Sequence, residues 1–204
     1  MKRYCCKECD TIFYTNPNVV VGALCLRHES ILMAKRNINP RKGLWTLPAG
    51  FMENAETLQE GAIRETFEET GLVIGRHASQ TVNTTHPVWR EYLSQGAEPP
   101  LEHMDFIARA ITPAYRTRRF DTRFFLIHDQ FIYNDPEQIT DASGELNEIH
   151  WLTLEKARLL DLPAITRWVI DMVEARIQLA PSRQIRQPAS FVHFSQGGPV
   201  SEAL

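Results

Sequence analysis

The sequence predicts an α/β fold, on the basis of apolar β-branched runs, a well-capped helix after them and an amphipathic helix near the end. Residues 19–26 are almost wholly apolar and rich in valine, so they are expected to form a buried strand. Residues 31–36 follow a short polar turn and are expected to complete a hairpin with them. A further short strand is expected at 43–48, directly before Ala49 and Gly50.

The best-defined predicted element is a helix from about Leu58 to Thr70. Thr57 and Glu60 have the Ser/Thr-x-x-Glu spacing of a capping box, in which each side chain accepts from a backbone N–H group of the other residue. Gly71 stands where a glycine commonly ends a helix. Both ends of this helix are therefore predicted from local chemistry.

The later elements have weaker signals. Residues 76–101 combine glycine and prolines with little periodicity, and they are expected to form a long connection. Strands are expected at 106–111, 123–128, 131–133 and 149–152, and helices at about 153–160 and 164–179. The expected organisation is a lead-in over residues 1–17, one domain over 18–180, and an irregular tail over 181–204 that is rich in Ser, Gln, Pro and Gly.

The composition is that of an ordinary globular protein, with 43% hydrophobic and 23% charged residues. A net charge of −3 provides no overall basic field, so no nucleic-acid partner is expected. No apolar stretch approaches the roughly 18 residues that span a bilayer, so no membrane partner is expected either. The N-terminus lacks the apolar core of a secretory signal and the cysteines crowd into the first 25 residues, which favours a cytoplasmic location.

Three glutamates share one face of the predicted helix. At 100° per residue, Glu65, Glu68 and Glu69 fall within an arc of about 100°, while Ile63 and Phe67 point the opposite way. Like charges at this spacing repel each other, and the negative end of the helix dipole adds to the cost. Mg²⁺ prefers carboxylate oxygens and completes its shell with water and phosphate, so this face is a candidate metal site. A merely solvated acidic surface is the alternative.

The residues around this helix resemble the Nudix box, Gly-x5-Glu-x7-Arg-Glu-U-x-Glu-Glu-x-Gly-U, where U is bulky and aliphatic. The match starts at Gly50 and ends at Leu72, and every invariant position is occupied. The one departure is Thr66, at a position where the family prefers an aliphatic residue, and a small packing cost is expected there. The resemblance implies a Nudix-type α/β/α sandwich around a mixed β-sheet.

The resemblance also implies roles for the box residues. Glu65, Glu68 and Glu69 would bind the catalytic Mg²⁺, or Mn²⁺ in its place, together with the backbone carbonyl of Ala49. Glu65 is also the first candidate for activating the attacking water. Arg64 would orient Glu65 through a charge-assisted hydrogen bond.

Other positions have supporting or open roles. Glu56 would support the box as an outer acid, and Gly50 would supply a tight turn that presents the carbonyl before it. Glu145 precedes a predicted strand, where several Nudix families place an additional metal-binding or base-like glutamate; a plain polar turn is an equal alternative. Trp45 and Phe51 flank the box and would either stack on a base or fill the core.

Four arginines lie within eight residues of a chain that has no overall basic excess: Arg116, Arg118, Arg119 and Arg123. Guanidinium groups this close repel one another unless an anion lies among them, and arginine can bind phosphate oxygens in bidentate fashion. They are therefore candidate substrate-binding residues. A solvated loop whose charges pair with Asp121 and other nearby acids is an equal alternative.

The N-terminal Cys6-x2-Cys9, with Cys5 adjacent, resembles half of the zinc ribbon that precedes the Nudix domain in NADH pyrophosphatase-like members. A structural zinc site needs four ligands, and no second pair follows, so zinc is not expected. Cys25 falls in a predicted buried strand and is expected to behave as a small core hydrophobe.

The expected function is therefore Mg²⁺-dependent hydrolysis of the diphosphate bond of a nucleoside diphosphate linked to another group. The zinc-ribbon resemblance favours a nucleotide sugar or dinucleotide such as ADP-ribose or NADH, and a dNTP is a further substrate class. The expected partner is a small nucleotide; the oligomeric state is left open, with a homodimer as one possibility because dimers are common in the family. The alternative is a Nudix fold that senses nucleotides without turnover, although such proteins typically lose box acids that this chain keeps.

Overall fold

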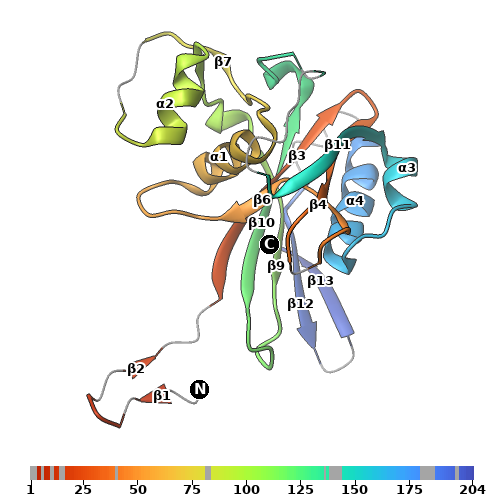
Figure 1. Ribbon diagram of the computed structural model, residues 1–204. Helices are drawn as coiled ribbons and strands as arrows, with labels where there is room; N and C mark the ends of the chain where they lie inside the picture. Colours follow the sequence, from red (N-terminus) through yellow and green to blue (C-terminus); the bar gives the residue numbers. More distant parts are fainter. Residues whose placement is uncertain are drawn as a thin grey trace.

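A mixed β-sheet forms the centre of the computed structural model, which describes residues 4–5, 7–9, 12–13, 17–39, 41–80, 84–135, 137, 144–179, 187–195 and 198–204 (Figure 1). Within these residues the main path across the sheet is β11 (Leu146–Thr153), β4 (Ser30–Arg36), β3 (Asn18–Arg27), β10 (Phe120–His128), β9 (Asp105–Ile111), β12 (Ser190–Ser195) and β13 (Gly198–Ala203). Two short strands extend it: β5 (Trp45–Thr46) pairs with β4, and β6 (Ala49–Phe51) pairs with β3. The sheet is mixed because β10 runs parallel to β3 and β12 parallel to β9, whereas the other pairs are antiparallel.

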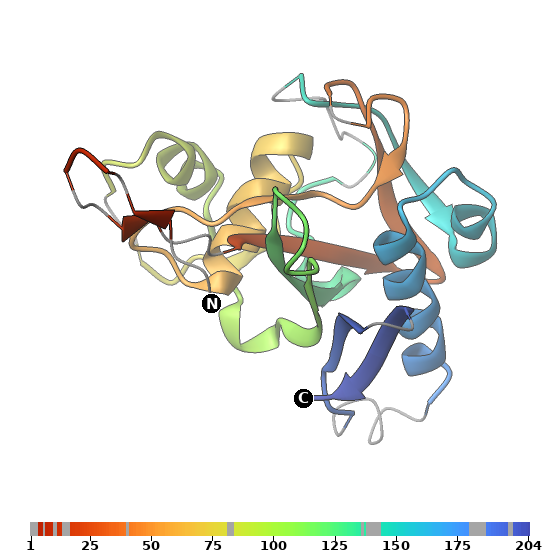
Figure 2. The same ribbon diagram turned by 90° about the horizontal axis from the view of Figure 1, so that it is seen from below.

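Helices cover both faces of the sheet (Figures 1 and 2). Helices α1 (Leu58–Thr70) and α2 (Pro87–Ser94) lie on one face, and α3 (Leu154–Arg158) and α4 (Ala164–Ile177) lie on the other. Side chains alternate along a strand, so Ala23 of β3 packs in the α1 cluster while its neighbour Leu24 packs in the α4 cluster. The predicted α/β/α sandwich around a mixed sheet is confirmed.

The remaining elements are short. Strands β1 (Tyr4–Cys5) and β2 (Ile12–Phe13) form a separate hairpin near the N-terminus, and β7 (Arg76–His77) pairs with β8 (Ala97–Glu98) beside α2. Two 3₁₀ turns, η1 (Leu101–His103) and η2 (Asp129–Phe131), flank β9 and β10. No helix in the described part of the chain is long and apolar enough to cross a membrane.

Helix α1 has the bounds and both caps that the sequence predicts. The Thr57 side chain accepts from the Glu60 backbone N–H, the Glu60 side chain accepts in return, and Gly71 ends the helix in the left-handed region at φ 69°. Thr66 is fully buried, and its hydroxyl donates to the Ala62 carbonyl at 2.8 Å. The polar group at this aliphatic position is thus satisfied within the helix, which explains why the departure from the motif is tolerated.

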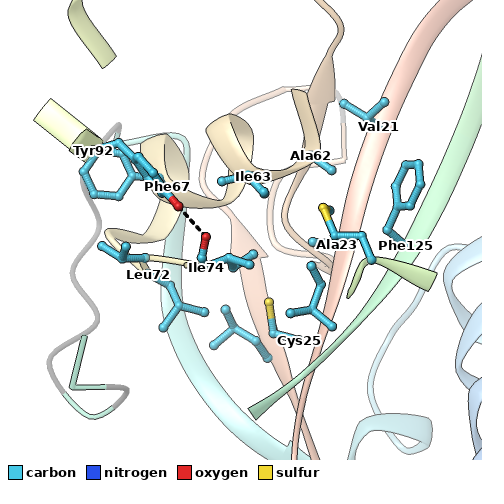
Figure 3. Packing of buried hydrophobic residues seen from close by; sticks show 14 of the residues in the cluster. Val21, Ala23, Cys25, Ala62, Ile63, Phe67, Leu72, Ile74, Tyr92 and Phe125 are labelled. Atoms are coloured by element: carbon cyan, nitrogen blue, oxygen red, sulfur yellow. Dashed lines mark hydrogen bonds between the residues drawn. The ribbon is translucent and has the colours of Figure 1, made fainter. Parts of the chain in front are cut away.

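Helix α2 packs against α1 in the hydrophobic cluster on this face of the sheet (Figure 3). Tyr92 of α2 is 1% exposed, meets Phe67 of α1 edge-on at 5.7 Å between ring centroids, and donates its hydroxyl to the Ile74 carbonyl. Cys25 lies in the same cluster, and burial raises the pKa of its thiol to about 12. The prediction that Cys25 is a core hydrophobe is confirmed.

Three predictions about local structure are wrong. Residues 76–101 are no plain connection, because they contain β7, α2 and β8; an eight-residue helix is too short to show periodicity. The tail after residue 181 is not irregular throughout, because β12 adds to β9 and is followed by β13. Residues 131–133 hold the end of a 3₁₀ turn and one isolated bridge, from Ile132 to Ile74, in place of a strand. The structure of the tail and of residues 131–133 depends on pairing with residues far away in the sequence, which local patterns do not show.

Candidate active site

Arg64 lies at the centre of a buried ionic cluster on α1. Its side chain is 2% exposed and donates to both carboxylate oxygens of Glu56, each at 2.9 Å. The same guanidinium donates to the Phe51 carbonyl at 2.9 Å and to Glu68 at 2.7 Å, and its Nη1 atom lies 3.1 Å from a carboxylate oxygen of Glu65. The predicted contact with Glu65 is present, but the bidentate contact with Glu56 is the more complete one.

The pKa values in this cluster describe a fixed ion pair. Burial alone would lower the pKa of Arg64, but hydrogen bonding to Glu56 and the charge of Glu65 hold it above its ordinary value. Burial alone would raise the pKa of Glu56, yet the hydrogen bonds from Arg64 and from the Glu53 backbone hold it below its ordinary value. Arg64 and Glu56 are therefore charged and bound to each other.

Glu65 has the opposite character. Its side chain is 15% exposed, and burial raises its pKa to about 7 even though Arg64 lowers it. The neighbouring charge of Glu68 raises it further. A carboxylate whose pKa lies near 7 changes protonation in the range where most enzymes work, which suits a group that accepts a proton or binds a cation.

Glu69 is more deeply buried, at 5% exposure. Burial raises its pKa well above the ordinary value, and the charge of Glu65 adds to this effect. The backbone N–H of Ala49 in β6 donates to Glu69 at 2.9 Å and partly compensates. The charges of Glu145 and Arg36 also act on Glu69, the first raising its pKa and the second lowering it. Two box acids therefore repel each other in a poorly solvated place.

The glycine that begins the box leaves room for the Glu65 carboxylate. A Cβ atom added to Gly50 would lie 2.0 Å from a carboxylate oxygen of Glu65. The prediction that Gly50 forms a tight turn is wrong, because it lies within strand β6 and is not among the described residues with positive φ. Strand β6 instead approaches α1 so closely that a side chain at this position would force the Glu65 carboxylate to shift.

The donor set of this face fits a hard divalent cation. Glu65 and Glu69 offer poorly solvated carboxylate oxygens whose pKa values are raised, first of all by burial, and Mg²⁺ prefers carboxylate oxygens as ligands. Over the described residues no three His, Cys, Asp or Glu side chains are already gathered into a metal cage. Glu68 accepts from Arg64 and Glu69 from the Ala49 backbone N–H through one carboxylate oxygen each, so the second oxygen of each would be the one to bind a metal.

The structure brings Glu145 near the box. The Glu145 carbonyl accepts from the Asn37 backbone N–H at 2.9 Å, and its carboxylate charge acts on Glu69. Arg36 at the end of β4 also acts on Glu69, and sequence reasoning missed it. The spacing along the strand could have indicated it. Leu32, Ala34 and Arg36 are two residues apart, so their side chains point to the same face of the sheet, and Leu32 packs on the α1 face.

The two aromatic residues beside the box differ in exposure. Trp45 is half-buried against the α4-face cluster and lies between Lys35, whose Nζ is 5.9 Å from the ring centroid, and His150, at 6.0 Å. Phe51 is 53% exposed and meets Phe120 at 6.1 Å. Trp45 therefore contributes to packing, whereas Phe51 presents its ring to solvent.

The four arginines separate into two groups. Arg119 donates to the Thr112 carbonyl at 3.2 Å, and Arg123 donates to Asp121 at 3.1 Å, beside a second pair between Asp121 and Arg109. Arg116 and Arg118 lie exposed in the turn between β9 and β10, which projects from the sheet where β10 begins (Figure 1). The alternative interpretation, pairing with Asp121, thus holds for Arg123.

The cysteine pair is only partly described. Cys5 is in β1 and Cys9 is exposed, but Cys6 lies outside the described residues. The expectation about zinc therefore stays a prediction.

Comparisons with known proteins agree on one family. Over 60 residues the chain is 45% identical to an ADP-ribose pyrophosphatase from Methanocaldococcus jannaschii, covering 29% of this chain and 36% of that protein. Over 69 residues it is 36% identical to the NAD-capped RNA hydrolase NudC from Vibrio parahaemolyticus, covering 33% of this chain and 25% of that protein. The chain thus spans only about a quarter to a third of the length of these curated relatives.

Comparison of the fold with solved structures leads to the same family. The crystal structure of a NUDIX hydrolase from Alicyclobacillus acidocaldarius superposes with a TM-score of 0.61 at 20% identity, covering 78% of this chain and 92% of that one. At this identity the likeness concerns the fold. A family model described as the NUDIX domain matches residues 16–172, most of the chain, and together with the occupied box it shows that the chain belongs to the Nudix family.

Proposed function

We propose that this chain hydrolyses the diphosphate bond of a nucleoside diphosphate linked to another group, with Mg²⁺ or Mn²⁺ as cofactor. The observation that carries the proposal is the pair of poorly solvated carboxylates, Glu65 and Glu69, whose pKa values are raised by burial and by the charges of neighbouring glutamates. A purely structural helix gains nothing from this arrangement. Divalent cations at the same place would remove the repulsion.

The residues divide into those that would hold the ions and those that would position them. Glu65, Glu68 and Glu69, with the Ala49 carbonyl, are the proposed ligands. When bound there, the metal supplies positive charge that favours ionisation of a water and stabilises charge on the diphosphate. Arg64 fixes Glu65 from the buried side of the helix, at 3.1 Å.

Additional groups complete the proposed site. Glu56 keeps Arg64 in place through its two hydrogen bonds. Glu145 is the proposed additional base or metal ligand, supported by the effect of its charge on Glu69. The exposed ring of Phe51 offers a stacking surface for a base, which Trp45 offers less because it is half-buried.

The favoured substrates are ADP-ribose and NADH, with a dNTP as a further class. The names of the two curated relatives, an ADP-ribose pyrophosphatase and an NAD-capped RNA hydrolase, support the first class. Arg116, Arg118 and Arg119 are the proposed phosphate-binding residues, of which the first two lie exposed in the β9–β10 turn.

A substrate panel tests this proposal. Purified protein is incubated with Mg²⁺ and ADP-ribose, NADH, dATP or an NAD-capped oligonucleotide, and the products are separated by chromatography. Release of AMP from ADP-ribose or NADH, absent in EDTA and in Glu69→Gln, is the expected result. Tight binding of these nucleotides without any hydrolysis would instead support the alternative, a nucleotide-sensing module without turnover.

A further inference from the structure

A histidine before α2 reaches the loop that leads into the box helix. His86 is the residue before Pro87, and its Nε2 atom lies 2.9 Å from a carboxylate oxygen of Glu53. The imidazole makes no capping hydrogen bond to α2, and its Nδ1 atom is buried without a hydrogen-bond partner among the described residues. The polar contact of the His86 side chain is therefore the one with Glu53.

Glu53 has a fixed backbone and a side chain with two cationic or donor neighbours. Its backbone N–H donates to Glu56 at 2.6 Å, so the main chain is held by the ionic cluster itself. One carboxylate oxygen contacts His86, and the other lies 4.0 Å from Nη1 of Arg64, beyond hydrogen-bond distance. A small rotation of this side chain would bring it onto Arg64.

The nitrogen that Glu53 would reach is already in use. Nη1 of Arg64 donates to Glu68 at 2.7 Å and lies 3.1 Å from Glu65. A guanidinium nitrogen of this kind carries two N–H groups; Glu68 accepts from one of them, and Glu65 lies within ion-pair distance of the same atom. A third carboxylate at Nη1 would displace Glu65 or Glu68 from the contact that fixes its direction.

We propose that His86 is a positioning residue for the metal-binding face: by holding Glu53, it keeps that carboxylate from competing with Glu65 and Glu68 for Arg64. The inference rests on the proposed function only in taking these two acids as metal ligands. The 76–101 segment packs against α1 through α2. The contact between His86 and Glu53 adds a direct polar connection from this segment to the box.

Manganese binding tests the inference without any turnover. Mn²⁺ is titrated into purified protein, and free Mn²⁺ is followed by electron paramagnetic resonance. His86→Asn preserves a residue favoured before a helix, but its amide corresponds to the Nδ1 position and does not reach Glu53. Because His86 acts one contact further out than a group bonded to a ligand, the Kd for Mn²⁺ is expected to rise about five-fold. His86→Gln, with a longer donor, is expected to restore most of the affinity.

The second substitution separates competition from simple tethering. In the His86→Asn background, Glu53→Ala removes the competing carboxylate, so the Kd for Mn²⁺ is expected to return to within about two-fold of wild type. Glu53→Ala alone completes the cycle. His77→Ala is the matched control, because His77 belongs to the same segment but stacks on Tyr133 instead. Circular dichroism and melting temperature verify that each variant folds.

Two outcomes would overturn the inference: a wild-type Kd in His86→Asn, or a double variant no better than His86→Asn. Wild-type protein that binds no Mn²⁺ would overturn it together with the metal-dependent part of the proposed function. Mn²⁺ binding without hydrolysis of any substrate in the panel would count against the proposed activity alone, since the Kd comparison remains decisive for His86.

Discussion

Replacing Glu65 with Gln should make the metal-free protein more stable at alkaline pH while abolishing most of its activity. The pKa of Glu65 is about 7, against 4.5 for an ordinary glutamate. Because this pKa is raised, the group favours the folded state most at low pH, and that contribution is lost as pH rises from about 4.5 to 7. Each pH unit between the two values corresponds to about 1.4 kcal/mol, so ionised Glu65 costs the metal-free fold about 3 kcal/mol at pH 8.

The Gln variant removes this cost and retains the size of the side chain. For a chain of this length 1 kcal/mol corresponds to about 2–4 °C, so in EDTA at pH 8 the melting temperature of Glu65→Gln should exceed wild type by about 6–12 °C. At pH 4.5 the two should melt together, because Glu65 is protonated there. Added Mg²⁺ should stabilise wild type at pH 8 and the variant much less.

The assay is thermal unfolding followed by circular dichroism, at pH 4.5 and pH 8, with EDTA or Mg²⁺. Turnover of ADP-ribose is measured in parallel, and kcat should fall about 100-fold or more through loss of a metal ligand. Equal melting temperatures at pH 8 without metal would refute the argument that burial raises the pKa of Glu65. A near wild-type kcat would refute its assignment as a ligand.

Three further variants follow from the same geometry. Arg64→Ala leaves Glu56 buried without its partner and should lower the free energy of unfolding by about 3–5 kcal/mol in denaturant titrations; a loss below 1 kcal/mol would contradict a buried ion pair. Gly50→Ala places a methyl group against the Glu65 carboxylate, the far end of a flexible side chain, so kcat should fall about ten-fold or more with the melting temperature within a few degrees of wild type. Arg116→Ala or Arg118→Ala should raise the KM for ADP-ribose about ten-fold with a much smaller effect on kcat; unchanged KM in both variants would assign phosphate binding to other residues.

The box helix could be predicted from sequence because its determinants are local. Thr57, Glu60 and Gly71 act within one turn of the helix ends, and the spacing of the acids fixes which of them share a face. The metal-binding role assigned to those acids stays a prediction. The spacing could not predict how deeply each acid is buried, because the burial of Glu69 depends on how closely β6 approaches α1.

The wrong predictions have a common physical cause. Strand β12 exists because Val192 and its neighbours meet β9, about eighty positions earlier in the chain, and no local pattern announces such a partner. Helix α2 is held by Tyr92, whose ring reaches Phe67 and whose hydroxyl reaches Ile74. Propensity over eight residues is too weak to predict a helix that tertiary contacts stabilise.

The arginine run shows why charge clusters in a sequence are ambiguous. Arg116, Arg118 and Arg119 precede strand β10, which begins at Phe120, whereas Arg123 lies within it, so residues close in the sequence have different environments. Arg123 is held by Asp121, which also binds Arg109 across the β9–β10 pair. Asp121 lies two residues from Arg123, so the sequence alone suggests that pair. The contact between Asp121 and Arg109 could not be predicted, because it depends on the register in which β9 and β10 pair. Among the proposed phosphate-binding residues, Arg116 and Arg118 are therefore the first to test, because Arg119 already donates to the Thr112 carbonyl.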